Sequence, residues 1–359
     1  MAPDSKSMAG HMDSLAQQLA ATAERLRDNP ASLDSLEEKR SKLVESAEAL
    51  LRVLKPADPI MDAMVTLIQF TAIRLFVGWK AFEAIPSDGA ISHSDLGSST
   101  GTKPRIGGDY VAHTRVSATF VSGSPMTAIV KMAFDDQLRT LHAMPAYFNE
   151  YGLKEPTGRY KTIFAFAAGD PDLTVWEHPN RSPERKANFM ASMAAMGSRM
   201  PMTGSYDFSW ILDKMSDAGD RALVVDVGGG SGHALQAIVK ATPGLPMNRC
   251  VVEDLEAVVE EAKATATGEV KQAQFVAMGF HSQQPVTGAL VYQIRRCLHD
   301  YGGDDCVKVL EQIRKAMADD SRLLIVEQVM GNPPSPFAAA NDVYISTIGG
   351  KERLLARML

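Results

Sequence analysis

Cysteine is scarce in this chain, and its scarcity excludes two kinds of stabilising framework. Only Cys250, Cys297 and Cys306 occur among 359 residues. Their number is odd and their spacing does not match a zinc-binding motif, so we expect neither a disulfide scaffold nor a bound metal. Hydrophobic residues make up 45% of the chain, which is enough for a sizeable core without such staples.

An excess of positive charge is also lacking. Lysine and arginine together number 37, against 43 aspartates and glutamates, and the net charge is −6. Proteins that bind nucleic acid usually carry a basic surface. We therefore expect a small-molecule substrate and no nucleic-acid partner.

The sequence offers no signal peptide and no uninterrupted hydrophobic run. Its first twenty residues contain no basic stretch followed by an apolar one. The most apolar window, residues 60–85, is interrupted by Asp62, Arg74 and Lys80. This window is typical of a buried helix pair packed on another part of the chain or on a second copy, not of a membrane span. We expect a cytoplasmic protein with no membrane partner.

The order of the predicted elements indicates two domains. At roughly 150 residues per domain, the length allows about two. Helical patterns at residues 13–28, 35–54 and 59–85 begin a mainly helical part that extends to about residue 215. From residue 220, short β-rich runs alternate with helical segments; the runs are 222–227, 248–253, 274–277, 289–294 and 322–328. This alternation predicts an α/β fold with a doubly wound parallel sheet.

A glycine-rich turn follows the first of these strands. Gly228, Gly229, Gly230 and Gly232 stand between an apolar strand that contains Asp226 and a predicted helix. Glycines let a ligand approach the backbone closely, and the start of a helix offers free N–H groups. The next strand ends in Asp254, and an acid at that strand tip can hold ribose hydroxyls. Together these features predict a nucleotide-like cofactor.

Several segments in combination resemble S-adenosylmethionine-dependent O-methyltransferases of the plant caffeate-like and fungal secondary-metabolite class. They are LVVDVGGGSGHALQAIV, VVEDLEAVVEEA, QPVTGALVYQIRRCLHDYGGDDCVKVLEQIRKAM, RLLIVEQVM and IGGKER. The segment IRLFVGWKAFEAIPSDGAISHSDLGSSTGTKP resembles the winged-helix dimerisation domain of that family. The resemblance implies a class I methyltransferase domain over residues 151–359. It also implies a helical dimerisation domain over residues 1–150 and a homodimer.

The resemblance also implies the residues that contact S-adenosylmethionine. Gly228, Gly230 and Gly232 would line its methionine and ribose part, and Asp254 would hold the ribose hydroxyls. Three further residues are expected beside the cofactor: Asp226, Phe280 and Arg296.

The family's general base matches His299, which would take the proton of a phenol or enol as its oxygen attacks the methyl group. An imidazole near neutral pH suits that task. Glu327 and Glu352 match the carboxylates that orient this histidine. A carboxylate on the far ring nitrogen fixes the tautomer.

Methionines and aromatic residues precede the cofactor domain and predict a wall for a bulky apolar substrate. Phe189, Met190 and Met193 lie on one predicted helix. Methionine is adaptable and suits a pocket for flat or irregular molecules, although each of these side chains taken singly fits core packing as well. Asp300 is expected to contact the same substrate.

Four features depart from the family pattern. Gly279 stands where the family has an acid near the adenine, and Tyr301 stands where it commonly has tryptophan. A helix of the winged fold is missing near residues 104–108. The chain ends at Leu359, before the antiparallel hairpin that usually completes the sheet, which would leave a sheet edge exposed.

Two alternatives therefore stay open. Some fungal proteins of this fold are pericyclases or dehydratases that act on polyketide–amino-acid products and keep the cofactor for its charge. His113 and Arg295 are the residues that would polarise a substrate oxygen in that reaction. The third possibility is a truncated, inactive homologue, which the two gaps and Gly279 favour.

Overall fold

The computed structural model describes residues 58–102, 109–156, 158–197 and 206–355, with isolated positions before residue 58 and Thr203. Of the helix expected at 13–28, residues 13, 14, 16–21 and 24 are described and are helical. The helix expected at 35–54 falls largely outside the described residues, and segment 104–108 falls entirely outside them. The chain divides into two compact units, Met1–Ala72 and Ile73–Leu359. The boundary expected near residue 150 stays a prediction.

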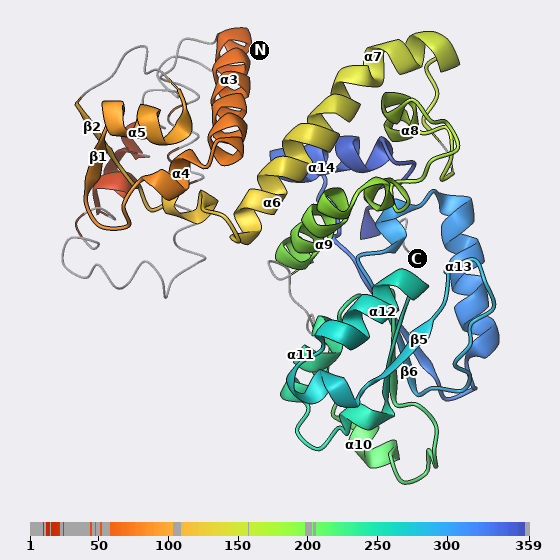
Figure 1. Ribbon diagram of the computed structural model, residues 1–359. Helices are drawn as coiled ribbons and strands as arrows, with labels where there is room; N and C mark the ends of the chain where they lie inside the picture. The colour runs from red at the N-terminus through yellow and green to blue at the C-terminus, as the bar shows by residue number, and fades with distance from the viewer. Residues whose placement is uncertain are drawn as a thin grey trace. The chain divides into compact units, whose positions relative to one another are not determined.

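Helix α3 (Pro59–Gly78), orange in Figure 1, carries many apolar side chains that are exposed. Of its 20 residues only Val77 is buried. Its exposed apolar side chains include Ile60, Met61, Met64, Val65, Leu67 and Ile68. By length and composition it is the one helix in the described part of the chain that could cross a membrane. Within one chain α3 is thus mostly exposed, and the expectation that it packs on another part of the chain or on a second copy stays a prediction.

Short elements follow α3. After helix α4 (Ala81–Ala84), strands β1 (Ala90–Ser92) and β2 (Tyr110–Ala112) form an antiparallel pair. Helix α5 (His93–Thr100) begins directly after β1. The Ser92 hydroxyl accepts a hydrogen bond from the Asp95 N–H at 3.1 Å, which is the usual role of a serine N-cap. The winged-helix assignment stays a prediction.

The chain is mainly helical from residue 117 to residue 214. The segment Ala133–Leu138 between α6 and α7 is a π-helix, and such segments are often found at functional sites. Helix α6 packs against α9, and α7 packs against α8. The elements are η2 (Ser117–Phe120), α6 (Pro125–Met132), α7 (Arg139–Tyr151), α8 (Ile163–Ala168), η4 (His178–Arg181), α9 (Pro183–Gly197) and α10 (Trp210–Lys214).

The second half of the chain forms a five-stranded parallel sheet in the order β5-β4-β3-β6-β7. Each strand lies within two residues of its predicted position, and the predicted α/β class is confirmed. The elements are β3 (Val224–Val227), α11 (His233–Ala241), η5 (Met247–Arg249), β4 (Cys250–Asp254), α12 (Glu256–Thr265), η6 (Gly268–Gln272), β5 (Gln274–Ala277), β6 (Val291–Arg295), η7 (Leu298–Asp300), α13 (Gly303–Ala316), β7 (Arg322–Val326) and α14 (Pro336–Ser346).

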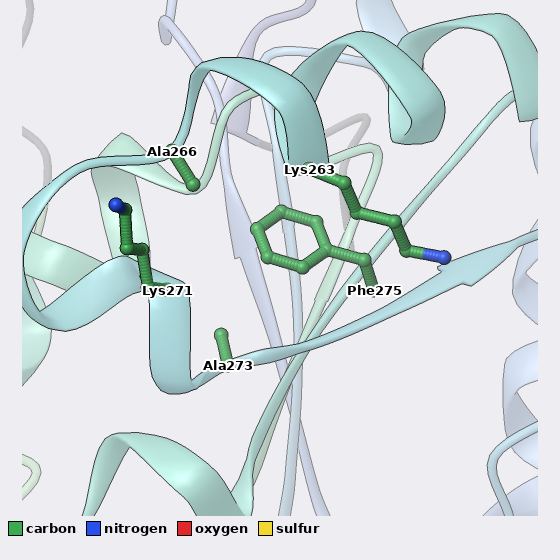
Figure 2. A pocket seen from close by; sticks show the side chains of 5 residues that line it. All are labelled: Lys263, Ala266, Lys271, Ala273 and Phe275. Carbon is green, nitrogen blue, oxygen red and sulfur yellow. The ribbon is translucent and has the colours of Figure 1, made fainter.

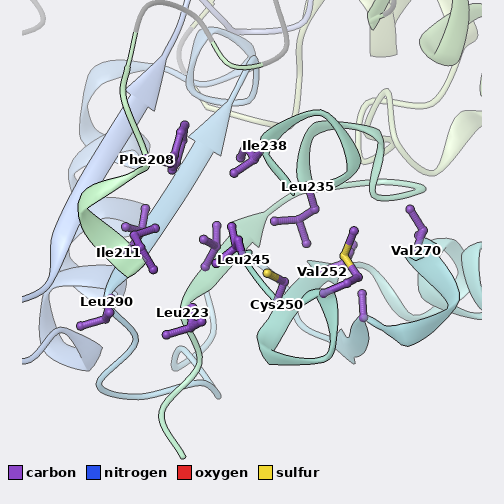
Figure 3. Packing of buried hydrophobic residues seen from close by; sticks show 14 of the residues in the cluster. Phe208, Ile211, Leu223, Leu235, Ile238, Leu245, Cys250, Val252, Val270 and Leu290 are labelled. Atoms are coloured by element: carbon purple, nitrogen blue, oxygen red, sulfur yellow. The ribbon is translucent and has the colours of Figure 1, made fainter. Parts of the chain in front are cut away.

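Two hydrophobic clusters cover the two faces of this sheet. Val224 and Val252 pack with Leu235 and Ile238 of α11 on one face (Figure 3). Val225 packs with α13 on the other face. Successive strand residues thus enter different clusters, as the period-two geometry of a strand requires. Burial on both faces explains why these strands are continuous runs of apolar residues.

The sheet reverses its direction of winding between β3 and β6. The chain moves from β3 to β4 and β5 on one side and then crosses to β6 and β7 on the other. In open α/β sheets, ligands bind at the carboxyl ends of the strands at such a switch point. The side chains that follow β3, β4, β6 and β7 therefore border the expected ligand position.

Candidate active site

The glycine turn after β3 packs tightly at one residue and stays open at another. A Cβ at Gly228 would stand 2.7 Å from the Phe280 ring and 2.8 Å from the Cys297 sulfur, and the φ of Gly228 is +76°. Around Gly230, no described atom lies within 4 Å of where a Cβ would stand. A side chain is thus excluded at Gly228, whereas a ligand can approach the backbone at Gly230.

Asp254 at the end of β4 faces this turn. Its Oδ2 accepts a hydrogen bond from the Gly230 N–H at 2.9 Å, and its Oδ1 accepts one from the Leu255 N–H at 2.7 Å. Burial raises the pKa of Asp254, while these two bonds oppose the shift. The carboxylate therefore stands beside the open part of the turn, where ribose hydroxyls would be held.

Two further acids lie buried beneath the turn. Asp226 is 1% exposed, and its Oδ2 has no hydrogen-bond partner in the described part of the chain. Burial raises its pKa to about 7, and the charge of Arg295 offsets this only in part. Glu253 is fully buried, accepts a 2.7 Å hydrogen bond from Gln284, and has its pKa raised to about 7, again chiefly by burial.

These features fit the expected cofactor. The open backbone at Gly230, the carboxylate of Asp254 and the orphaned oxygen of Asp226 supply the groups that bind a ribose and a charged amino-acid end. Gly279, in place of the family's acid, leaves one contact to be made by other groups. The individual contacts to cofactor stay predictions.

His299 lies at the end of the neighbouring strand β6, in η7, and is 8% exposed. Its Nδ1 stands 2.8 Å from Glu327 Oε2. Glu327 Oε1 accepts hydrogen bonds from the Cys297 and Leu298 N–H groups at 2.9 and 2.8 Å. Glu327 thus fixes both the imidazole and the backbone that carries it, and the expected pairing with His299 is present.

The second ring nitrogen of His299 is also engaged. Its Nε2 lies 3.1 Å from Asp300 Oδ1. Burial alone would lower the pKa of His299, but Asp300 and Glu327 outweigh burial and raise the pKa to about 10. Burial acts to raise the pKa of Glu327, but His299 and Arg296 hold it below its usual range. The imidazole of His299 thus stands between two acidic side chains.

Arg296 and Glu352 occupy places that differ from those expected. Arg296 pairs with Glu327 at 3.4 Å and with Glu352 at 3.3 Å. Glu352 accepts a 2.7 Å hydrogen bond from Asn341, and none of its contacts in the described structure reaches His299. Glu352 is therefore linked to His299 only indirectly: it pairs with Arg296, Arg296 pairs with Glu327, and Glu327 contacts His299. Arg296 faces these carboxylates, and its contact with cofactor remains a prediction.

The loop 349–353 fixes the turn that carries His299. The Lys351 N–H donates to the His299 carbonyl at 2.7 Å, and a Cβ at Gly350 would collide with the same carbonyl. Arg353 donates to the carbonyls of Leu298 and Tyr301 at 3.0 and 2.8 Å. The motif IGGKER thus supports the backbone of the site as well as supplying Glu352.

Phe280 and Tyr301 form an aromatic contact between the two halves of the site. Their rings meet edge to face at 5.9 Å, and Phe280 also packs on Gly228. Tyr301 is buried. Tyr301, which stands where the family commonly has tryptophan, thus places an aromatic ring against Phe280, and Phe280 borders the glycine turn where a cofactor is expected.

The residues expected to contact substrate are more dispersed. Phe189, Met190 and Met193 are half-buried on α9, and Phe189 meets Trp176 edge to face. Arg295 donates to the Gly197 carbonyl at the end of α9 at 3.1 Å, which joins this helix to the sheet. His113 contacts the Ser117 hydroxyl at 3.1 Å. No contact between His113 and Arg295 is found among the described residues.

One polar cluster joins the π-helix to η4 and α9, and no sequence motif predicted it. Asp136, in the π-helix, contacts His178 at 3.3 Å and Arg185 at 2.8 Å. The three residues are separated by up to 49 positions in the chain, so no local motif announces them. They tie the π-helix to η4 and α9.

A hollow on the surface lies away from this constellation (Figure 2). It is lined by Lys263, Ala266, Lys271, Ala273 and Phe275. Ala273 and Phe275 stand at the beginning of β5, whereas the candidate site stands at the carboxyl ends of its neighbours. The hollow shares no lining residue with the candidate site.

Comparison with known proteins agrees with this geometry. A family model described as an O-methyltransferase domain matches residues 151–357. Methyltransferase cfoD from Aspergillus candidus is 33% identical over 340 residues, which cover 88% of this chain and 84% of the relative.

Solved structures share the fold. OxaC in complex with S-adenosylhomocysteine and oxaline has a TM-score of 0.82 at 23% identity and covers 97% of this chain and 92% of its own. LepI in complex with S-adenosylmethionine has a TM-score of 0.80 at 23% identity, with coverages of 96% and 92%.

Proposed function

The chain belongs to the family of S-adenosylmethionine-dependent O-methyltransferases, and on this premise we propose that it methylates a phenol or enol hydroxyl of a small, largely apolar secondary metabolite. One observation carries the proposal. The glycine turn with Asp254 and the His299–Glu327 pair stand at the carboxyl ends of strands that are neighbours in one sheet. A cofactor and an acceptor held there meet at the switch point.

The family's cofactor supplies, when bound, a methyl group carried on a positively charged sulfur. Asp254 holds the ribose hydroxyls, and the backbone at Gly230 approaches the ligand. Glu327 orients His299, and Arg296 with Glu352 holds Glu327 in turn. His299 faces the acceptor. Its role as a general base stays a prediction, and that role requires Nε2 to be free of Asp300.

The proposal is tested with labelled S-adenosylmethionine and a panel of phenols and pyridones, followed by mass spectrometry of the products. We expect label in the organic product, and a loss of roughly 100-fold in the His299→Gln variant. His142→Gln, at an exposed position on α7, is the matched control. Cofactor binding without label in any acceptor would contradict the proposal.

The pericyclase alternative depends on His113 and Arg295. Burial lowers the pKa of Arg295 while the charge of Asp226 opposes the shift, and its guanidinium bonds to the end of α9. Cofactor-dependent isomerisation of a substrate without label would establish it, whereas failure to bind the cofactor in calorimetry would indicate the inactive homologue.

We also propose that a second copy of the chain covers α3. A contiguous apolar surface of this kind is typical of a protein–protein interface, and a homodimer presents the same surface twice. Light scattering coupled to size exclusion should give twice the chain mass. Met64→Glu with Ile68→Glu should shift the protein to a monomer, whereas a wild-type monomer would contradict the proposal.

A further inference from the structure

The π-helix between α6 and α7 offers its side chains to three other elements. Asp136 contacts Arg185 of α9 at 2.8 Å and His178 of η4 at 3.3 Å. The next residue, Gln137, forms a side-chain hydrogen bond with Tyr344 of α14. Two consecutive residues thus hold α9 and α14 to the same short segment. Such π-helical segments are rare and are frequently found at functional sites.

The contact between Asp136 and Arg185 is well placed to fix α9. The Asp136 side chain is 22% exposed, and that of His178 is 6% exposed. Burial acts to raise the pKa of Asp136, but His178 and Arg185 hold it below its usual range. A hydrogen bond between a carboxylate and a guanidinium is short and strong, and the shape of the guanidinium makes it directional. Removal of the Asp136 charge should therefore loosen the first turn of α9.

Helix α9 is held at both of its ends. Arg185 lies in its first turn, and the carbonyl of its last residue, Gly197, accepts a 3.1 Å hydrogen bond from Arg295 of β6. The apolar side chains that are expected to form the acceptor wall lie between these two points; they are Phe189, Met190 and Met193. The position of this wall is therefore set by the π-helix at one end and by the sheet at the other.

Helix α14 connects the π-helix to the turn that carries His299. Tyr344 packs on a hydrophobic cluster that includes Phe164, and its phenol interacts with the charge of Asp300, the neighbour of His299. Phe164 in turn meets the His178 ring edge to face at 5.1 Å. A continuous set of contacts and charge interactions therefore runs from η7 through α14 and the π-helix to α9. From α9 it returns to β6, which leads into η7.

We propose that the π-helix determines which acceptors fit the site, because Asp136 and Gln137 fix the α9 wall relative to α14 and the His299 turn. This inference rests on the acceptor position of the proposed function. Asp136 and Gln137 are positioning residues in it and touch no substrate. The acceptor class that fits is a fused or substituted ring system, whose apolar part lies on α9 while its hydroxyl lies beside His299. A small phenol depends less on the wall.

A two-ring and a one-ring probe test the inference. Calorimetry measures the binding of 2-naphthol and of phenol to protein loaded with S-adenosylhomocysteine. The second ring buries apolar surface on α9, so we expect wild type to bind 2-naphthol about tenfold more tightly than phenol. In Asp136→Asn this affinity ratio should fall several-fold, with the affinities for phenol and for the cofactor product unchanged. An unchanged ratio would overturn the proposal, as would equal binding, or no binding, of the two probes in wild type.

Asp135→Asn is the matched control. Asp135 is the neighbour of Asp136 in the same π-helix, and its two oxygens bind Arg74 of α3 at 3.0 and 2.8 Å. Its partner lies on neither α9 nor α14. Both variants lose an ion pair of the π-helix, so we expect both to lower Tm, whereas only Asp136→Asn should change the affinity ratio. The same change of ratio in both variants would show a general loosening of the fold and would overturn the proposal.

Two further variants test the links on either side of the π-helix. Asp136→Asn combined with Arg185→Gln should reduce the ratio no more than either single substitution, because both remove the same contact. Tyr344→Phe removes the oxygen that Gln137 bonds, so it should also reduce the ratio. Additive losses in the double variant, or a wild-type ratio in Tyr344→Phe, would contradict the connected set of contacts.

Failure of the inference and failure of the proposed function give different results. With labelled cofactor, we expect Asp136→Asn to raise the KM for 2-naphthol several-fold and to leave kcat unchanged. Label in the products with the same KM values in wild type and Asp136→Asn would remove the inference and leave methyl transfer standing. No label in any acceptor would remove methyl transfer, while the affinity ratio of the two probes would still decide the role of the π-helix.

Discussion

Each half of the sheet's carboxyl edge buries a glutamate, and the pKa values of the two glutamates are shifted in opposite directions. On the β3–β4 side, Glu253 is fully buried with an amide partner, and its pKa is raised to about 7. On the β6–β7 side, the Glu327 side chain is 2% exposed, yet its pKa is lowered because His299 and Arg296 outweigh burial. Burial is similar in both halves, so the partner decides the charge.

The two halves of the site are therefore suited to different roles. The β3–β4 half offers backbone N–H groups and acids that ionise readily when a cation binds beside them, which suits a positively charged cofactor. The β6–β7 half holds fixed charges whose positions are set by one another. Removing a partner should therefore harm the second half far more than the first.

The largest effect is expected from Glu327→Gln. The amide can accept from the backbone but presents N–H groups where His299 and Arg296 also donate, so the pKa of His299 falls and the turn loosens. We expect kcat/KM to fall roughly 100-fold, with cofactor affinity within a few-fold of wild type. Glu311→Gln, at an exposed position on α13, is the control. Equal losses in cofactor affinity and in kcat/KM would contradict the separate roles of the β3–β4 and β6–β7 halves.

Gly228→Ala tests the other half. The new Cβ would press on Phe280 and Cys297 at a positive φ, so the turn must shift. We expect cofactor affinity, measured by calorimetry, to fall roughly 10- to 100-fold. Gly303→Ala, where no described atom lies within 4 Å of the new Cβ, should leave it unchanged. An unaltered affinity for Gly228→Ala would show that the turn does not contact the cofactor.

Much of this edge could be predicted from the sequence, because local patterns determine it. The central strands β3, β4 and β6 are buried and largely apolar, and the glycine turn, Asp254 and the His299–Glu327 pair follow from motifs. The places of Arg296 and Glu352 could not be predicted, because a contact between residues 56 positions apart depends on how the loop after α14 returns to β6. The cluster of Asp136, His178 and Arg185 is equally long-range, and the exposure of α3 depends on neighbours that its own pattern does not reveal.

A smaller effect is expected from Asp226→Asn on stability. The folded pKa of Asp226 is raised from 3.8 to about 7, so the folded state holds this proton more tightly than the unfolded chain. Its contribution to stability is complete below pH 3.8 and is lost as the pH rises through 7. The free energy of unfolding should therefore fall less between pH 4 and 7 in the variant, by an amount on the order of 1–3 kcal/mol. Urea titrations at each pH measure the free energy of unfolding, and Asp220→Asn is an exposed control. The same pH dependence of this free energy in wild type and Asp226→Asn would contradict the raised pKa of Asp226.

The smallest effect is expected from Gly279→Asp, which should raise cofactor affinity where Gly228→Ala lowers it. A Cβ there would meet only the Ser282 hydroxyl, at 3.7 Å, an ordinary contact. The substitution restores the acid that the family places beside the adenine, so we expect calorimetry to give a few-fold higher cofactor affinity. Weaker binding would indicate that this chain's cofactor contacts have been rearranged around the glycine.

The central claim is that the partners of His299 raise its pKa in the β6–β7 half, whereas burial raises the pKa values of Asp226 and Glu253 in the β3–β4 half. Nitrogen-15 NMR of histidine-labelled protein, assigned with His299→Gln, measures the first part directly. The account predicts that both ring nitrogens of His299 stay protonated through pH 9 and titrate at about 10. Titration at the ordinary histidine pKa of about 6.5 would contradict it.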